Sequence, residues 1–196
     1  MTKINHLKDI SDSKKSFIIY KSSNGFDLYT DFSKKIILTN KNIKDFINKA
    51  NRKKAKKKDT DLFIGFFGYE ILNNLIGVKI KKQKGLKFPK GIFYKPETKV
   101  KLQKKLNYKN LELIKSNKPF KVNINKPSYK VIFDKFKKKI KSGETYQIKI
   151  CTKYSNTAQI DALDFFCRLV KTNMAPEAFM IKDNNYSIIS CSPENL

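Results

Sequence analysis

The sequence predicts an α+β fold in which helices flank mixed or antiparallel sheets. Two residue patterns lead to this fold class. Apolar side chains recur every three or four positions in residues 128–141 and 161–170, which indicates amphipathic helices. Short apolar runs bounded by turn residues indicate strands, as in residues 17–29. Residues 177–181 and 186–191 form another such pair, joined by an Asp-Asn-Asn turn.

The first quarter of the chain contains three predicted strands and one helix. Residues 17–20 and 26–29 form two of the strands, and an Asn-Gly pair at residues 24–25 marks the turn between them. Residues 35–39 are a third candidate strand. Residues 42–58 are predicted to be a helix, and its lysine-rich end suits the negative end of the helix dipole.

A continuous apolar run at residues 62–67 predicts a buried strand. Gly65 and Gly68 lie near its end, where the missing side chains are expected to let the strand pack closely against a helix. A further short strand is predicted at residues 91–94, within a stretch that is rich in lysine, glycine and proline.

A polar segment with two prolines, residues 116–127, is the predicted boundary between two regions. Residues 1–118 form the amino-terminal region, and residues 119–196 begin a second domain. Residues 192–194, Ser-Pro-Glu, have the form of a helix start. Because the sequence ends directly after this helix start, we expect the chain to be a fragment of a longer protein.

The helix at residues 128–141 is the clearest element of the second region. Ser128 is its predicted N-cap, and Gly143 supplies the left-handed residue with which the chain leaves it. Asp161 is the predicted N-cap of the following helix. We expect the first helix to lie on a core through the apolar stripe of Tyr129, Ile132, Phe133, Phe136 and Ile140.

After this helix the apolar period changes from about four to two, which predicts a strand over residues 145–154. Tyr146 and Ile148 belong to its core face. Gln147 and Lys149 belong to the opposite, polar face, next to the turn that ends the helix. The function of this segment depends on what the glutamine contacts.

The net charge of +26 raises the question of a nucleic-acid partner. Only Arg52 and Arg168 are arginines, whereas recognition of bases and phosphates favours the arginine fork. The lysines are spread along the whole chain, which is typical of solvated surface. Nucleic acid is therefore not the expected partner. The alternative function is a lysine-rich α+β protein that binds nucleic acid or an anionic surface, which a steep salt dependence of DNA binding would reveal.

The cysteine and histidine content excludes several classes of site. The three cysteines, Cys151, Cys167 and Cys191, have neither disulfide-framework nor metal-ligand spacing, and His6 is the only histidine. Reduced thiols and a cytoplasmic location are expected. The sequence has neither a signal peptide nor an apolar run approaching the roughly 20 residues of a membrane span, so no membrane partner is expected.

Four segments, in order along the chain, resemble one family. Residues 143–147, Gly-Glu-Thr-Tyr-Gln, are similar to its G-D-x-Y-Q signature. Residues 64–70 resemble its G-x-x-G-Y-E/D segment, residues 173–179 its N-P-x-P-Y segment and residues 191–194 its S-P-E-x-F segment. The family is that of the chorismate-utilising enzymes, which includes component I of anthranilate synthase and of aminodeoxychorismate synthase. The resemblance implies an incomplete chorismate-binding fold, of which residues 119–196 are the start.

The resemblance implies that chorismate is the substrate and that ammonia is added to its ring. Relatives that add water carry a lysine base where this sequence has Gln147. A neutral amide takes no proton but can position ammonia by hydrogen bonds, so Gln147 favours the ammonia users. Lys149, two residues further on the same strand face, is a weaker candidate for contacting a substrate carboxylate.

The resemblance also implies partners, an effector site and a cofactor. A glutamine amidotransferase subunit or domain would supply the ammonia. Pro176 matches a segment that contacts tryptophan in inhibited anthranilate synthases, but Glu177 replaces the expected tyrosine, which favours aminodeoxychorismate synthase. The complete enzyme is expected to use Mg²⁺. Its glutamate ligands lie after the S-P-E segment in the family, so this chain is expected to contain no metal site and to be inactive alone.

Overall fold

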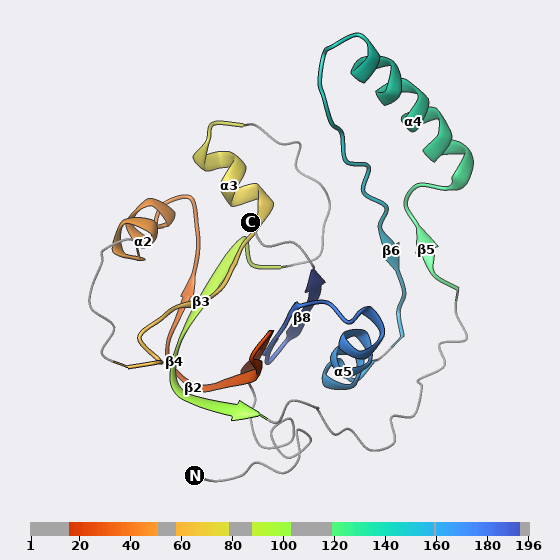
Figure 1. The fold of residues 1–196 in the computed structure, drawn as a ribbon. Coiled ribbons are helices and arrows are strands. Elements are labelled where there is room, and N and C mark those ends of the chain that lie inside the picture. The colour runs from red at the N-terminus through yellow and green to blue at the C-terminus, as the bar shows by residue number, and fades with distance from the viewer. Residues whose placement is uncertain (1–15, 51–57, 79–87, 103–118, 159, 193–196) are drawn as a thin grey trace. The chain divides into compact units, whose positions relative to one another are not determined.

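The computed structural model describes residues 16–50, 58–78, 88–102, 119–158 and 160–192, and it divides into two compact units (Figure 1). Unit 1 comprises residues 1–111 and 161–196, and unit 2 comprises residues 112–160. This division reflects spatial contacts, and the predicted boundary after residue 118 stays a prediction. Antiparallel sheets and four helices in the described residues confirm the predicted α+β class.

A six-stranded sheet forms the body of unit 1 (Figure 1). Its strands lie in the order β3-β4-β2-β1-β7-β8, and every neighbouring pair is antiparallel. The predicted hairpins at both ends of the chain are confirmed as β1–β2 and β7–β8. The strands are β1 (Phe17–Ser22), β2 (Gly25–Ile37), β3 (Ile64–Phe67), β4 (Gly91–Leu102), β7 (Glu177–Asp183) and β8 (Tyr186–Ser192).

Strand β2 is longer than its sequence pattern indicates, and the separate strand predicted at residues 35–39 is wrong. Residues 35–37 instead continue β2, which runs unbroken to Ile37 alongside β4. The backbone is irregular at Asp31, whose φ is 53°, and the register with β4 shifts between Phe32 and Lys34. A bulge of this kind interrupts the alternation of side chains, which is why the sequence reads as two strands.

The two glycines near β3 allow backbones to approach, but the partner is a strand and not the predicted helix. A Cβ atom at Gly65 would lie 1.9 Å from the Ile92 carbonyl oxygen of β4, and one at Gly68 would lie 2.3 Å from the Lys90 carbonyl oxygen. The backbone N–H of Gly68 donates to that same Lys90 oxygen at 2.7 Å. Any side chain at these positions would force β3 away from β4. Helix α3 (Tyr69–Leu75) begins directly afterwards.

The sheet curls strongly. Strands β4 and β7 are separated in it by β2 and β1, which in a flat sheet would place them about 14 Å apart. The hydroxyl of Tyr94 on β4 nevertheless donates a hydrogen bond to Asp183 at the end of β7. The face that carries both side chains is therefore concave, and it buries a core cluster of Ile18, Tyr29, Ile92, Tyr94 and Ile181.

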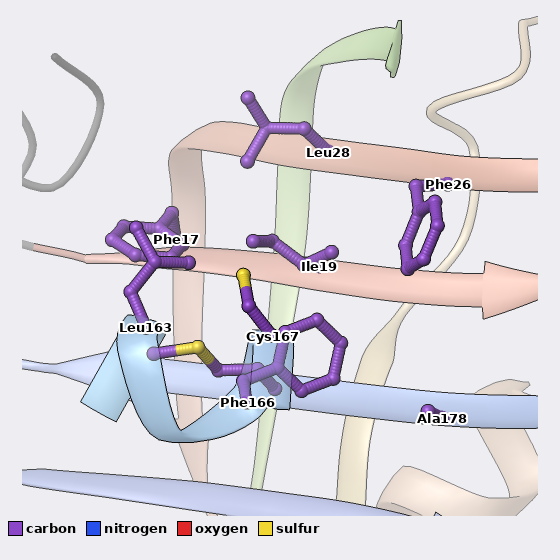
Figure 2. Packing of buried hydrophobic residues seen from close by; sticks show 9 residues of the cluster. Phe17, Ile19, Phe26, Leu28, Leu163, Phe166, Cys167 and Ala178 are labelled. Atoms are coloured by element: carbon purple, nitrogen blue, oxygen red, sulfur yellow. The ribbon is translucent and has the colours of Figure 1, made fainter. Parts of the chain in front are cut away.

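Helix α5 (Ala162–Asn173) covers the opposite face over β1, β2, β7 and β8 (Figure 2). Its predicted cap is confirmed, because the Asp161 side chain accepts a hydrogen bond from the Asp164 N–H at 2.7 Å. Figure 2 shows Leu163, Phe166 and Cys167 of this helix directed at the strands. The cluster they enter also contains Phe17, Ile19, Phe26, Leu28, Ala178 and Met180. Helix α2 (Ile43–Ala50) and α3 bury a third cluster, of Leu38, Ile43, Phe46 and Ile71.

Unit 2 contains helix α4 (Lys126–Lys141) and a two-stranded sheet of β5 (Lys121–Val122) and β6 (Tyr154–Ser155). The predicted N-cap at Ser128 is wrong. Asn125 caps the helix, and its side-chain oxygen accepts from the Ser128 N–H at 2.9 Å. Proline in the first turn costs no hydrogen bond, so the helix begins before Pro127 rather than after it. Gly143 has the predicted left-handed conformation, with a φ of 76°.

The expected core beneath α4 is not observed in the described structure, where no residue of this helix is buried. Likewise the strand predicted over residues 145–154 is wrong, since residues 144–153 form no strand, and Tyr146 is 91% exposed instead of facing a core. A strand requires a neighbour for its N–H and C=O groups. Among the described residues of unit 2, the only ladder is the short β5–β6 pair.

Among the described residues no helix has the length and apolar character needed to cross a membrane.

Candidate functional site

The predicted catalytic segment follows α4 in unit 2. Gln147 and Lys149 both lie in this segment with exposed side chains, outside any strand. The Thr145 hydroxyl donates to the Gln147 backbone oxygen at 3.2 Å, which fixes the local chain direction. The exposed amide is available for hydrogen bonds. Within the described part of unit 2, however, the sheet that was expected to present it is absent.

An ion pair between Lys139 and Glu144 connects the two sides of the turn before this segment. The Glu144 carboxylate accepts a hydrogen bond from Lys139 and lies 3.3 Å from the Ser142 hydroxyl, which can donate to it. The Lys139 hydrogen bond, together with its positive charge, lowers the pKa of Glu144 below its usual value. Because the group is exposed, this pair contributes to the shape of the turn more than to stability.

The predicted effector residue Pro176 lies in unit 1, in the turn that connects α5 to β7. Met174 ends the helix in the left-handed conformation, with a φ of 47°. The ammonium of Lys21 on β1 donates to the carbonyl oxygens of Ala175 at 2.5 Å and Pro176 at 3.1 Å. This turn is thus attached to β1 by a charged side chain from the other end of the sequence.

Two ionisable groups border this turn. Burial, reinforced by Glu177, raises the pKa of the Tyr20 hydroxyl. Burial also raises the pKa of the Cys191 thiol, against the opposing effect of Lys21. Both groups therefore stay protonated at neutral pH, and neither is a nucleophile or a base there.

A second polar cluster lies on the concave face of the sheet and consists of Lys35, Tyr94, Asp183 and Tyr186, which we call the Asp183 cluster. The Asp183 side chain is 4% exposed, and its Oδ2 atom lies 2.5 Å from the Lys35 ammonium. The Tyr94 hydroxyl donates to this same oxygen, while the Asn184 N–H donates to Oδ1 at 2.7 Å. The hydroxyls of Tyr94 and Tyr186 are 3.0 Å apart. The carboxylate thus has donors on both oxygens.

The hydrogen bonds decide the charge state of this cluster. Burial alone would raise the pKa of Asp183, but the bonds from Lys35, Tyr94 and Asn184 lower it below its usual value. Burial and the bond to Asp183 raise the pKa of Tyr94 far above that of a free tyrosine. Burial also raises the pKa of Tyr186. The cluster is therefore a charged carboxylate surrounded by neutral phenols and one ammonium, which suits a structural connection between strands.

The described residues do not fit a magnesium site. In the parts of the chain that the structure describes, no three acidic, cysteine or histidine side chains come together. The buried carboxylate of Asp183 is already paired with Lys35.

The predicted site residues are distributed over two units, with Gln147 and Lys149 in unit 2 and Pro176 in unit 1. Three residues with well-defined polar contacts were not predicted: Lys21, Tyr94 and Asp183. The sequence identifies Asp183 only as part of a hairpin turn and Tyr94 only as a strand residue, and Lys21 directly follows the strand predicted at residues 17–20. The hydrogen bonds of Lys21 to Pro176, of Lys35 to Asp183 and of Tyr94 to Asp183 join residues 155, 148 and 89 positions apart, and no local pattern signals such pairs.

A family model of chorismate binding enzymes matches residues 9–196. The match covers nearly the whole chain, including the α3, α4 and α5 segments, and the chain therefore belongs to the family of chorismate binding enzymes. This confirms the family to which the four sequence segments pointed. A search of curated proteins found no match.

Proposed function

We propose that this chain is component I of an aminodeoxychorismate synthase or an anthranilate synthase and adds ammonia to chorismate. The proposal is supported by one sequence feature in a member of the chorismate binding enzymes: the segment at residues 143–147 ends in glutamine. In relatives that add water, a lysine stands at the position of Gln147. The identity of this residue separates the two reactions.

The chemical reason is the difference between the two nucleophiles. Water must lose a proton to attack, so an enzyme that adds water needs a base. A lysine can serve when its site lowers its pKa from about 10.4. Ammonia is nucleophilic enough to attack without first losing a proton, so it needs positioning more than deprotonation. The Gln147 amide accepts and donates hydrogen bonds without exchanging a proton, which suits the second task.

Gln147 is accordingly the proposed positioning residue, and Lys149 is the proposed contact to a substrate carboxylate. Both side chains are exposed in unit 2. An amide in bulk water orients nothing, so the proposal requires that further residues enclose this segment. In the family, the glutamates that hold Mg²⁺ and most carboxylate-binding residues follow the S-P-E segment. We propose that residues beyond Leu196 in a longer polypeptide supply them.

The proposed partners follow from the reaction. A glutamine amidotransferase subunit or domain provides ammonia, and both proteins act in the cytoplasm. Of the two products we favour aminodeoxychorismate, because Glu177 stands where tryptophan-inhibited relatives have tyrosine. Pro176 keeps the proposed role of an effector contact.

The test is product analysis with the complete open reading frame that contains this sequence. Purified enzyme receives chorismate, Mg²⁺ and ammonium, and aminated and hydroxylated products are separated by chromatography. We expect the wild type to form an aminated product, and Gln147→Lys to lose amination and gain the water adduct. Lys149→Met is the matched control, which should raise KM and keep the aminated product. A hydroxylated product from the wild type would overturn the proposal.

The polypeptide of residues 1–196 alone serves as the negative control, and we expect it to leave chorismate unchanged. Turnover of chorismate by this polypeptide would show that the proposed further metal-binding and carboxylate-binding residues are not needed.

A further inference from the structure

Residues 144–153 connect α4 to β6 and are attached to the rest of unit 2 at both ends. At the first end, the Glu144 backbone N–H donates to the Lys139 carbonyl oxygen at 3.1 Å, and the two side chains form an ion pair. At the second end, the Lys153 N–H donates to the Asn123 side-chain oxygen at 2.6 Å, and the Asn123 N–H donates to the Lys153 carbonyl oxygen at 3.1 Å. The segment therefore starts and ends at fixed points.

Between these points, the described residues make one hydrogen bond that restrains the segment from within. The Thr145 hydroxyl donates to the Gln147 backbone oxygen at 3.2 Å. Neither residue belongs to a helix or a strand, so no regular ladder of backbone hydrogen bonds restrains Gln147. A residue without such bonds can occupy both the extended and the helical regions of backbone conformation. The Thr145 hydroxyl is thus the group that selects one orientation for the Gln147 peptide.

The orientation of this peptide restricts where the Gln147 side chain points. The hydrogen bond closes a ring of atoms from the Thr145 side chain to the Gln147 carbonyl, and the Gln147 Cα atom lies within this ring. Closing the ring restricts the backbone torsions of residues 145–147 together, and with them the direction of the Cα–Cβ bond. An amide that holds ammonia by hydrogen bonds depends on this direction, because a misplacement of about 1 Å can cost a large part of the rate.

We infer that Thr145 is a positioning residue for Gln147 in the amination of chorismate. Thr145 can have this role only if Gln147 has its proposed one, so the inference rests on the proposed function. Position 145 is the unspecified one in the G-D-x-Y-Q signature that this segment resembles, and the hydroxyl is therefore a feature of this sequence and not of the signature. Thr145 acts through the backbone of Gln147 and takes no part in the chemistry itself.

The test compares variants of the complete open reading frame. Thr145→Val removes the hydroxyl and keeps the branched shape, whereas Thr145→Ser keeps a hydroxyl and removes only a methyl group. Thr152→Val is the matched control, because Thr152 lies in the same segment and its hydroxyl makes no hydrogen bond with the described residues. Each protein receives chorismate, Mg²⁺ and ammonium, and kcat and the KM for chorismate are determined separately.

We expect Thr145→Val to lower kcat for the aminated product by about two- to tenfold, which corresponds to the loss of one hydrogen bond of ordinary strength. The KM for chorismate should stay unchanged, because the proposed substrate contact at Lys149 is kept. Thr145→Ser and Thr152→Val should have the wild-type kcat. Thr145 is not a positioning residue if Thr145→Val keeps the wild-type kcat or changes KM alone. Equal losses in Thr145→Ser or in Thr152→Val would also overturn this role.

A second measurement reports the order of Gln147 without any reaction. Protein labelled with ¹⁵N in glutamine gives a backbone amide signal for Gln147, which is identified by its absence from Gln147→Lys. The heteronuclear NOE of this signal reports backbone order on the picosecond-to-nanosecond timescale. The NOE should fall in Thr145→Val and keep the wild-type value in Thr145→Ser and Thr152→Val. An unchanged NOE in Thr145→Val would refute the inference.

The two measurements separate the role of Thr145 from the proposed function. If the wild type forms a hydroxylated product, the proposed function fails, and the NOE still decides whether Thr145 orders Gln147. If the wild type forms the aminated product and Thr145→Val matches it in kcat and NOE, only the role of Thr145 is refuted.

Discussion

Replacing Asp183 by asparagine tests whether the Asp183 cluster holds the curled sheet together. The change keeps the shape of the side chain and removes its charge. Hydrogen bonds to charged groups contribute about 1.5–3 kcal/mol each. Lys35 is 44% exposed in its ion pair with Asp183, so its share must be discounted for screening by water. The asparagine oxygen can still accept from Tyr94, which leaves a net loss of about 2 kcal/mol.

The pH dependence gives the stronger test. The folded-state pKa of Asp183 is lowered, so its contribution is present above the unfolded value of about 3.9 and is lost as pH falls through the folded value. Wild type should therefore lose stability between about pH 5 and pH 2, and Asp183→Asn should lose less over the same range. Near neutral pH the variant should melt about 4–8 °C below the wild type.

The assay is thermal unfolding followed by circular dichroism at several pH values. Asp59→Asn is the matched control, because the Asp59 side chain is 86% exposed and lies 3.8 Å from Lys99. It should change neither Tm nor the pH slope measurably. The reasoning fails if Asp183→Asn has the midpoint and pH slope of the wild type. In that case the hydrogen bonds between β4 and β7 would not maintain the curl of the sheet.

Two further predictions concern backbone packing in the sheet and the burial of the thiols. Gly65→Ala should lower the free energy of unfolding, measured by chemical denaturation, by about 1–3 kcal/mol, because the added Cβ would lie 1.9 Å from the β4 backbone. Gly77→Ala should lower the free energy of unfolding by only about 1–2 kcal/mol, because Gly77 has a φ of 79° but open space around it. A larger loss for Gly77→Ala than for Gly65→Ala would contradict this prediction. Burial, with smaller effects of two nearby aspartates, raises the pKa of the Cys167 thiol to about 12. Alkylation at pH 8 should therefore modify the exposed Cys151 in the native protein and Cys167 only after unfolding; equal native rates would be the contrary result.

The sequence by itself determined the elements whose signals are local. Hairpins β1–β2 and β7–β8 are marked by turn residues between apolar runs, and both exist. Helix α5 carries its cap at Asp161 and its apolar stripe within a dozen residues. The four family segments are likewise short, and the match over residues 9–196 confirms the family that they indicated. Each of these features depends on residues that are neighbours in the chain, so the local residue pattern is enough to predict it.

The tertiary structure decided everything that depends on distant partners. Whether residues 145–154 become a strand depends on a neighbouring strand, and the part of unit 2 that the structure describes provides one only for Tyr154–Ser155. The continuation of β2 through its bulge depends on β4, with which it pairs on both sides of the irregularity. The contact of Lys21 with the turn before β7 exists because antiparallel pairing places β1 beside β7. The bond between Tyr94 and Asp183 exists because the sheet curls and brings β4 towards the end of β7. Hydrogen bonds across a sheet are set by strand order, and strand order has no local signature in the sequence.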